Sequence, residues 1–147
     1  MSEDIEALAT ALFGELLMAD QLARGLLGQA LPKGMELNQF SVLNHLARTT
    51  DERTPAQLAQ SFHVTRGAMT NTLRKLETAG YVHIRPDWDD ARRKMVSLSP
   101  SGRSARDAAI AGLTPLISDV VNDVGVGDVR AALPVLRALR QRLLKPV

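Results

Sequence analysis

The chain has 147 residues, 45% of them hydrophobic and only 3% aromatic, with a net charge of +2 from 18 basic and 16 acidic side chains. This length and apolar content indicate one globular domain, and the near balance of charge leaves only local basic clusters to suggest a nucleic-acid partner. The absence of cysteine excludes disulfide bonds, thiolate zinc sites and thiol redox sensing.

The N-terminal segment predicts one long amphipathic helix. Apolar residues recur at steps of three and four positions from Ile5 to Ala30, and Pro32 and Gly34 end the pattern. The first residues, MSEDIEALAT, are acidic where a secretory signal would be basic, and no apolar run is long enough to span a bilayer. We therefore expect a cytoplasmic protein with no membrane partner.

Two shorter helices are predicted next. Asn38 is the expected N-cap of a helix over QFSVLNHLAR. The apolar face of that helix is expected at Phe40, Leu43, Leu46 and Ala47. The following helix starts at Thr54 and Pro55, and Gln57 completes a capping box with Thr54.

A longer helix with a polar face follows after the short break at residues 63–64. Thr65 is its expected cap, and Gly80 is expected to end it. Its buried stripe is expected at Met69, Leu73 and Leu76. A short helix, a tight turn and a longer polar-faced helix indicate a helix-turn-helix.

The hydrophobic period then changes from that of a helix to that of a strand. In YVHIR, Val82 and Ile84 fall on one side, and in KMVSL either Met95 or Val96 joins Leu98. The charged, proline-containing segment RPDWDDARR separates these two runs. Two strands joined by such a loop, directly after a recognition-type helix, predict a β-hairpin wing.

Two further helices are predicted at the C-terminal end. Ser99 and Pro100 repeat the pattern of a cap followed by proline and start a long helix, which Pro115 is expected to kink or split. The sequence NDVGVG predicts a loop, and Asp128 is expected to cap the last helix. Pro134 lies inside that helix, and the pattern does not explain it.

The order of these elements resembles the MarR family of winged helix-turn-helix transcription regulators. The most specific part is VTRGAMTNTLRKLETAGYVHIRPDWDDARRKMVSLSPSG, with the wing motif D-x-R-R followed by SLSPSG. The resemblance implies a mainly α fold with a small β-hairpin wing, in which residues 1–147 form one MarR-type domain. Residues 37–98 would be the DNA-binding core, and residues 1–36 and 99–147 the helices of an intertwined homodimer. The long apolar faces of the end segments agree with such a dimer.

Polar residues of the fourth predicted helix are the first candidates for DNA contact. Arginine can bond guanine bidentately, asparagine can bond adenine in the same way, and threonine can meet a base edge or the thymine methyl group. We expect Thr65, Arg66, Thr70 and Asn71 to meet base edges, and Arg74 and Lys75 to bind phosphates. The alternative is an ordinary solvated helix face, which the basic character of this one disfavours.

The wing supplies the second set of candidates. In similar proteins the residue at the position of Arg92 enters the minor groove, and Asp90 stands where it could orient that guanidinium through a charge-assisted bond. Arg93 and Lys94 are expected to contact flanking phosphates. Asp87 and Asp89 are expected to shape the turn. The rival interpretation is a metal site built from His83, Asp87, Asp89 and Asp90, which is disfavoured because carboxylates in a turn usually remain hydrated.

No pattern in the sequence predicts an enzyme, a cofactor or a metal. There is no nucleophile elbow, no His-x-x-x-His and no matched pair of carboxylates on one helix face. His45 and His63 are lone residues. His45 keeps some interest, because the resemblance implies an effector cavity between the first helix, the second helix and the winged domain.

The predicted function is that of a homodimeric regulator, expected to be a repressor, which binds a pseudo-palindromic operator in double-stranded DNA. A small aromatic or anionic effector is expected to relieve it. Two alternatives remain. The winged helix could be a protein-interaction module without DNA binding, which the basic face at Arg66, Arg74, Lys75 and Arg92 disfavours. A metal-sensing regulator would need clustered histidines, whereas the three in this chain are scattered.

Overall fold

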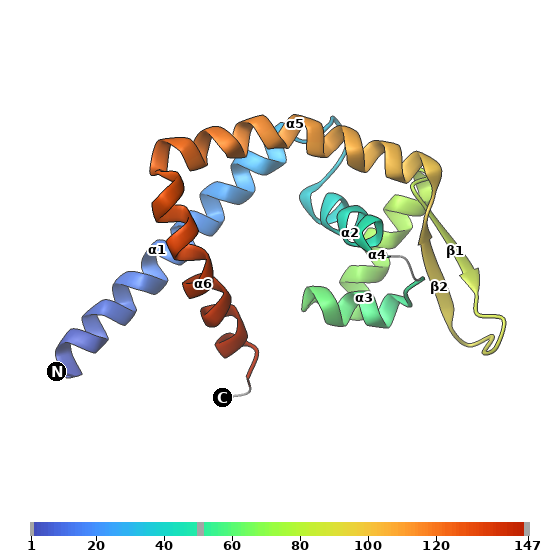
Figure 1. Cartoon of the computed structure of the whole chain (residues 1–147). Helices are drawn as coiled ribbons and strands as arrows, with labels where there is room; N and C mark the ends of the chain where they lie inside the picture. Colours follow the sequence, from blue (N-terminus) through green and yellow to red (C-terminus); the bar gives the residue numbers. More distant parts are fainter. Residues whose placement is uncertain (1, 50–51, 146–147) are drawn as a thin grey trace. The chain divides into compact units, whose positions relative to one another are not determined.

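The structure is a computed structural model that describes residues 2–49 and 52–145. Within these residues, helices and one antiparallel hairpin follow the order expected from the sequence (Figure 1). The elements are α1 (Ser2–Ala30), α2 (Leu37–Arg48), α3 (Pro55–Phe62), α4 (Arg66–Thr78), β1 (Val82–Pro86), β2 (Lys94–Leu98), α5 (Pro100–Val124) and α6 (Val126–Leu143). Internal contacts define two compact units, residues 1–110 and residues 111–147.

The start of α2 corrects the expectation for Asn38. Glu36 is the N-cap, with the extended backbone (φ −85, ψ 157) that this position requires. The Glu36 N–H donates to Gln39 Oε1 at 2.7 Å, and the N-cap lies two residues earlier than predicted. Asn38 lies within the first turn, and its side-chain amide donates to Thr72 Oγ1 of α4 at 3.2 Å. Its role is therefore to join α2 to α4.

The helix-turn-helix forms as its capping residues predict. Thr54 Oγ1 accepts the Gln57 N–H at 3.1 Å, and Gln57 Oε1 accepts the Thr54 N–H at 3.0 Å. The tight turn to α4 passes through His63, which takes the left-handed conformation at φ 54. Gly80 ends α4 at φ +80, and its N–H donates to Glu77 O at 2.9 Å. This is the C-terminal arrangement for which glycine is favoured.

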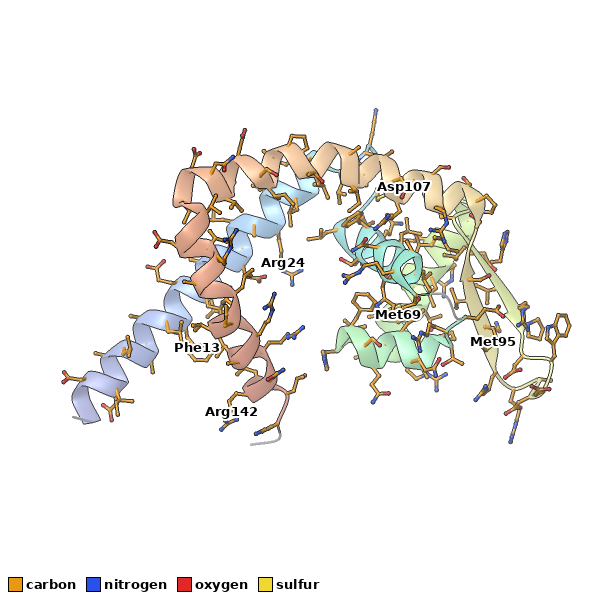
Figure 2. The ribbon with its side chains drawn as sticks, in the orientation of Figure 1. Phe13, Arg24, Met69, Met95, Asp107 and Arg142 are labelled. Carbon is orange, nitrogen blue, oxygen red and sulfur yellow. The ribbon has the colours of Figure 1, made fainter. Side chains whose placement is uncertain are left out.

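One apolar core holds α2, α3, α4 and the hairpin together. Its fully buried side chains are Val42, Leu43, Leu58, Leu73, Leu76, Val82 and Val96. In Figure 2, Met69 lies among the side chains that fill the space between these helices. Burying each such side chain stabilises the fold by about 1.5–3 kcal/mol. Of the face predicted for α2, Leu43 and Leu46 are buried, but Phe40 and Ala47 are only partly covered.

The register of the hairpin decides which residue of KMVSL faces the core. Val82 pairs with Leu98 and Ile84 pairs with Val96. Side chains of directly paired residues share a face of the sheet, so Val96 packs inward and Met95 lies on the opposite face. An isolated antiparallel bridge pairs Arg53 with Val96 on the other side of β2.

The first turn of α5 is joined closely to the end of α4. Ser99 Oγ accepts the Gly102 N–H at 2.9 Å, as a cap should, and donates to Gly80 O at 2.6 Å. A Cβ atom at Gly102 would lie 2.0 Å from Tyr81 O, so only glycine fits there. Further along α5, Arg106 Nε donates to Asn44 Oδ1 of α2 at 3.1 Å.

The C-terminal helices differ from the prediction in two ways. Of the two outcomes expected at Pro115, a kink or a split, the split does not occur, because α5 continues through it to Val124. The predicted loop is reduced to Gly125, whose φ of +121 favours glycine, so Asp128 lies in the first turn of α6 and is not its cap. Pro134 also lies within an unbroken helix. None of the described helices is by itself long and apolar enough to span a membrane, although α5 and α6 satisfy that length and composition as a pair bent by 102°.

Candidate nucleic-acid interface

The exposed face of α4 carries the side chains that the sequence predicts for DNA contact. Met69, Leu73 and Leu76 turn into the core, and this fixes the opposite face toward solvent. The exposed residues are Thr65, Arg66, Thr70, Asn71, Arg74 and Lys75. A helix that is apolar on one side and carries these donors on the other has the form of a recognition helix.

Two of these six residues are engaged in the protein itself. Thr65 Oγ1 accepts the Ala68 N–H at 3.1 Å, so it is the cap that the sequence predicts. Lys75 Nζ lies 3.0 Å from Glu36 Oε1 at the start of α2, an ion pair that no local pattern could indicate. Within the described residues, no side-chain hydrogen bond or ion pair engages the other four, Arg66, Thr70, Asn71 and Arg74.

The tip of the wing contains an ion pair between Asp90 and Arg92, at the spacing that the sequence suggested. Arg92 Nε lies 3.1 Å from Asp90 Oδ1, and the same oxygen accepts the Arg92 backbone N–H at 3.1 Å. These bonds from Arg92, first the side-chain one, lower the pKa of the Asp90 carboxyl. The Arg92 side chain nevertheless remains 91% exposed. One carboxylate thus restrains the guanidinium without covering it.

A second pair, between Asp87 and Arg93, closes the base of the loop. Arg93 NH2 lies 2.8 Å from Asp87 Oδ2, while Asp87 Oδ1 accepts the Asp89 N–H at 3.0 Å. The bond from Asp89, followed by that from Arg93, lowers the pKa of the Asp87 carboxyl. Asp87 therefore shapes the turn as predicted, whereas Asp89 contributes its backbone N–H to that bond.

A third cluster, which the sequence did not reveal, joins the base of the wing to the segment before α3. Arg85 Nε donates to Glu52 Oε2 at 3.1 Å, its NH2 bonds Glu52 Oε1, and its NH1 donates to Pro86 O at 2.8 Å. The Arg85 guanidinium also lies over the indole of Trp88, with Cζ 4.9 Å from the ring centroid. Glu52 and Arg85 are 33 residues apart, so only the paired hairpin brings them together.

The wing and the recognition helix line one groove. It has a volume of about 950 Å³ and lies between the start of α3, the exposed face of α4 and the inner side of the hairpin. Its basic lining residues are Arg66, Arg74, Arg85, Arg92, Arg93 and Lys94, and Glu77 is the one acidic residue in the part of the lining that the structure describes. In the described parts of the chain no group of three or more histidine and carboxylate side chains is placed to hold a metal ion.

The sequence profile of the MarR family matches residues 33–93, which include α2, α3, α4, β1 and the wing loop. The chain contains a MarR-family domain over these residues. Members of this family regulate transcription by binding DNA and are not enzymes, in agreement with the function class predicted from the sequence.

Solved structures of MarR-family regulators extend the similarity to nearly the whole chain. The transcriptional regulator BldR from Sulfolobus solfataricus has a TM-score of 0.80 and 26% identity, covering 91% of this chain and 95% of that one. A mutant MarR from E. coli, complexed with operator DNA, has a TM-score of 0.77 and 25% identity, covering 92% of this chain and 94% of that one. The predicted winged-helix fold is confirmed by these likenesses.

A curated relative matches over a shorter range. The transcriptional activatory protein BadR from Rhodopseudomonas palustris is 28% identical over 107 residues, which make up 71% of this chain and 61% of that protein. The match thus spans less than two thirds of the length of that relative.

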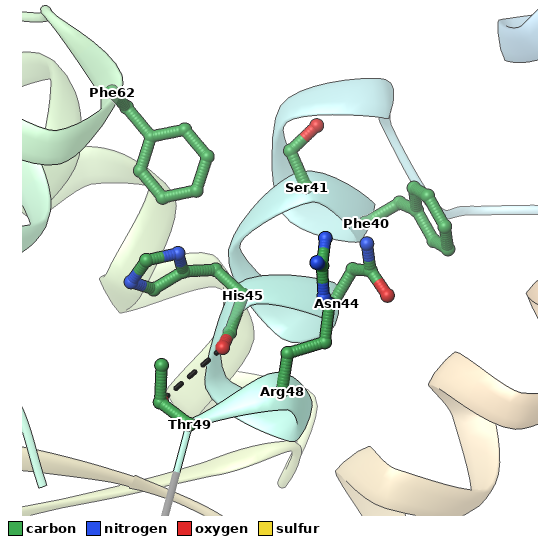
Figure 3. Close-up of a pocket in the computed structure, with 7 residues that line it drawn as sticks. All are labelled: Phe40, Ser41, Asn44, His45, Arg48, Thr49 and Phe62. Carbon is green, nitrogen blue, oxygen red and sulfur yellow. Dashed lines mark hydrogen bonds between the residues drawn. The ribbon is translucent and has the colours of Figure 1, made fainter. Parts of the chain in front are cut away.

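Helix α2 also borders two pockets. One, of about 520 Å³, is lined by Phe40, Ser41, Asn44, His45, Arg48, Thr49 and Phe62 (Figure 3). The rings of His45 and Phe62 meet edge to face, with centroids 5.3 Å apart. Burial, followed by the charges of Arg53 and Arg48, lowers the pKa of His45, so its ring is neutral near pH 7. The other pocket, of about 420 Å³, lies between α1, α2 and α4 and is mostly apolar.

Proposed function

We propose that this protein regulates transcription by binding double-stranded DNA as a homodimer. The observation that carries the proposal is the shared groove, where exposed polar residues of α4 and cations of the wing face one space of about 950 Å³. In this arrangement a duplex meets α4 with its base edges in the major groove, and the wing lies along the adjacent minor groove. The proposed site of action is the cytoplasm, where such a protein meets chromosomal DNA.

The proposed roles along α4 depend on which of its exposed side chains make no hydrogen bond or ion pair within the described part of the protein. Arg66, Thr70 and Asn71 lie in the first half of the helix and are proposed to read base edges. Arg74 is proposed to bind a phosphate. Thr65 and Lys75 contribute in a more limited way, because the first caps the helix and the second is paired with Glu36.

The proposed roles in the wing follow from exposure and pairing. Arg92 is proposed to enter the minor groove, held in a defined orientation by Asp90. Arg93 and Lys94 are proposed to contact the flanking phosphates. Acidic residues near DNA are unfavourable when unpaired, and the Asp87 and Asp90 carboxylates are both neutralised by arginines of the same loop.

The proposed dimer is supported by apolar side chains that a single chain leaves uncovered. On α1 the exposed large residues include Ile5, Leu8, Leu12, Leu17 and Leu22, and on α6 they include Leu133, Val135, Leu136 and Leu143. Exposed apolar surface of this extent indicates an interaction site, and a twofold copy of the same chain is the simplest partner. Residues 1–36 and 99–147 are the segments proposed to form the interface.

Repression is the proposed direction of regulation. A dimer bound at its operator excludes other proteins from that DNA without any further contact, whereas activation needs an additional interaction with the transcription machinery. Because the relative BadR is named an activatory protein, the direction has to be measured with a reporter gene placed behind the selected operator.

The proposed effector is a small aromatic anion that binds the pocket beside His45. Phe40 and Phe62 offer apolar surface, and Arg48 offers a cation within the same pocket of about 520 Å³. An effector can change DNA affinity only if it binds the DNA-competent and DNA-incompetent states with different affinity. Phenylacetate, compared with its neutral analogue phenylacetamide, tests both the aromatic and the anionic requirement. Release of DNA by the acid alone, abolished in Arg48→Ala, is expected; equal effects of both compounds, or none, would refute this effector chemistry.

The DNA-binding proposal is tested by selecting bound sequences from a pool of random duplexes. We expect a pseudo-palindrome with half-sites centred about 10 base pairs apart, because a twofold dimer presents its recognition helices one helical turn apart. Binding should weaken steeply as salt rises, since arginine and lysine displace condensed counterions. A pool that yields no motif, or binding that ignores salt, would contradict the proposal.

A further inference from the structure

Trp88 presents its side chain to solvent at the tip of the wing. It is the single tryptophan of the sequence and is 80% exposed. It lies in the loop between β1 and β2, two residues beyond Pro86. An indole is large and mostly apolar, with one N–H donor, and is favoured where one side is covered and the other meets a partner. The exposure of so large an apolar side chain on the wing suggests that it contacts a partner molecule.

One face of this indole is covered by a guanidinium that is itself fixed. Arg85 lies over the ring with Cζ 4.9 Å from its centroid. Glu52 and the Pro86 carbonyl together bond all three nitrogens of that guanidinium. Arg85 therefore cannot turn away easily, and it acts as a platform that holds the indole in one place.

The backbone beneath Trp88 is also held. The Asp87 N–H donates to Arg93 O at 3.0 Å, and the Arg93 N–H donates to Asp90 O at 3.0 Å. Asp87 Oδ1 accepts the Asp89 N–H, which closes a turn around Trp88 itself. The loop thus presents two side chains outward in defined positions, Trp88 and Arg92.

We propose that Trp88 is a second contact between the wing and duplex DNA, packing its uncovered face and its indole N–H against the sugar–phosphate backbone beside the minor groove. Arg85 and Glu52 are its positioning residues. This inference rests on the proposed DNA-binding function, and it adds a contact that is apolar and independent of base sequence.

Three observations favour DNA as the partner. Arg85 and Arg92, which flank Trp88 in the sequence, both line the groove shared with α4, so the indole adjoins the proposed interface. A cation behind the ring offsets the negative potential of its π face, which eases the approach of an anionic backbone to the other face. From Arg85 to Lys94 the wing carries four cations and three carboxylates, so its net charge is small. Attraction between net charges therefore gives the wing little affinity for DNA, and an apolar contact adds to that affinity.

The competing interpretation is that Trp88 only shields the ion pair between Arg85 and Glu52. In that case its loss would lower the stability of the hairpin but would leave DNA affinity unchanged once the protein is folded. The two interpretations therefore differ in whether DNA changes the environment of the indole.

The single tryptophan makes the test direct, because all indole fluorescence of the protein comes from Trp88. The full chain is titrated with a fluorescein-labelled duplex carrying the selected site, and anisotropy of the label is followed. A parallel titration with unlabelled duplex follows indole emission and its quenching by acrylamide. We expect emission and acrylamide access to fall with the same midpoint as the rise in anisotropy. A rise in anisotropy with no change at the indole overturns the inference but leaves the DNA-binding function standing. Absence of any rise in anisotropy overturns both.

Variants then measure the contact. Trp88→Ala should weaken binding about tenfold, equivalent to about 1.4 kcal/mol, with an unchanged salt slope because no charge is removed. Trp88→Phe should retain most of the affinity. Glu52→Gln, which releases Arg85, should increase acrylamide access to Trp88 in the free protein and reduce the change on adding DNA. Wild-type affinity in Trp88→Ala, verified as folded by circular dichroism, would contradict the inference.

Discussion

Asp90 and Arg92 form an ion pair in which the same residue bonds the carboxylate three times. The Arg92 backbone N–H and side-chain Nε each donate to Asp90 Oδ1 at 3.1 Å, and Arg92 NH2 donates to Asp90 Oδ2 at 3.4 Å. Because the donors are the backbone N–H and two side-chain nitrogens of Arg92, these bonds fix its side chain relative to its own backbone. Asp90 therefore acts on DNA only through the orientation of Arg92, in the proposed function. Loss of the Asp90 carboxylate is therefore expected to weaken DNA binding, whereas removal of a negative charge alone would be expected to strengthen it.

Arg92→Ala should weaken specific binding by about 1–3 kcal/mol, the usual value for one well-placed contact to a base pair. Asp90→Ala should weaken it too, although removing a negative charge near DNA would by itself tighten binding. The effects should not add, since Asp90 would have nothing to orient once Arg92 is gone. A double-mutant cycle followed by fluorescence anisotropy measures this coupling. Tighter binding by Asp90→Ala, or simple additivity, would show that the loop is only a solvated turn.

Lys94→Ala should lower affinity evenly across DNA sequences and reduce the salt slope by about one, as expected for a phosphate contact. Arg93→Ala should do the same, but it should also raise the pKa of Asp87, whose carboxylate loses the Arg93 guanidinium. Binding titrations over a range of salt concentrations, together with NMR titration of the Asp87 carboxyl, separate the two effects. Equal salt slopes in the wild type and both variants would rule out a phosphate role for either residue.

Leu136→Glu should break the proposed dimer. Leu136 is 47% exposed in the single chain, so a charge there costs little unless a partner covers the site. Arg137→Glu is the matched control, an exposed neighbour where a charge is already accommodated. Light scattering should give a monomer or aggregate for Leu136→Glu and a dimer for the control. A well-folded dimer of Leu136→Glu would remove α6 from the interface.

Gly102→Ala should destabilise the fold, because the added Cβ would lie 2.0 Å from Tyr81 O and force α5 away from the end of α4. Gly67→Ala in α4 is the control, since no atom lies within 4 Å of the corresponding Cβ. In a helix alanine is favoured over glycine by about 1 kcal/mol, so this control should be neutral or stabilising. Thermal unfolding measures both variants. A melting temperature of Gly102→Ala equal to that of the wild type would contradict the close approach of Gly102 to Tyr81 O.

The stability of the protein should fall as the pH drops below about 6.5, the ordinary pKa of histidine. The pKa of His45 is lowered in the fold by burial and by Arg53 and Arg48, so the unfolded chain binds a proton at this position more readily than the folded one. The contribution of His45 to the free energy of unfolding is fully present above the pKa of His45 in the unfolded chain. It is lost as the pH falls through the lower pKa of His45 in the folded protein. Denaturant unfolding at several pH values should show this decline, and His45→Gln should reduce it. The same decline in the variant would assign it to other groups.

Local signals in the sequence determined much of the fold. Thr54 with Gln57, Thr65, and Ser99 each satisfy backbone N–H groups within three residues, so their capping roles can be predicted without tertiary information. The alternation of the two strands was visible, but the choice between Met95 and Val96 required the register, which depends on pairing across the hairpin.

The misplaced elements were those where several residues compete for one role. Asn38 is a residue type favoured at an N-cap, but Glu36 takes that position, where its backbone N–H is bonded by Gln39 three residues beyond it. At the start of α6 the backbone freedom of Gly125 allows the turn in one residue, so Asp128 is not needed as a cap. Pro115 removes only one helical hydrogen bond, and α5 continues through it.

The parts of the candidate site that sequence could not give depend on long-range contacts. The exposed face of α4 and the pair of Asp90 with Arg92 follow from short spacings. By contrast, Lys75 meets Glu36 and Arg85 meets Glu52 across 39 and 33 residues. Such partners decide which cations are available to DNA, and only the folded chain brings them together.

Chemical footprinting on the selected duplex tests most directly whether α4 and the wing bind DNA together. We predict that guanine N7 atoms in two half-sites, about 10 base pairs apart, are protected from methylation, since N7 lies in the major groove. Sugars at the flanking minor grooves should be protected from hydroxyl radicals by the wing, and Arg92→Ala should weaken that outer protection while keeping the inner one. Protection confined to one groove, or none at all, would contradict joint binding by α4 and the wing.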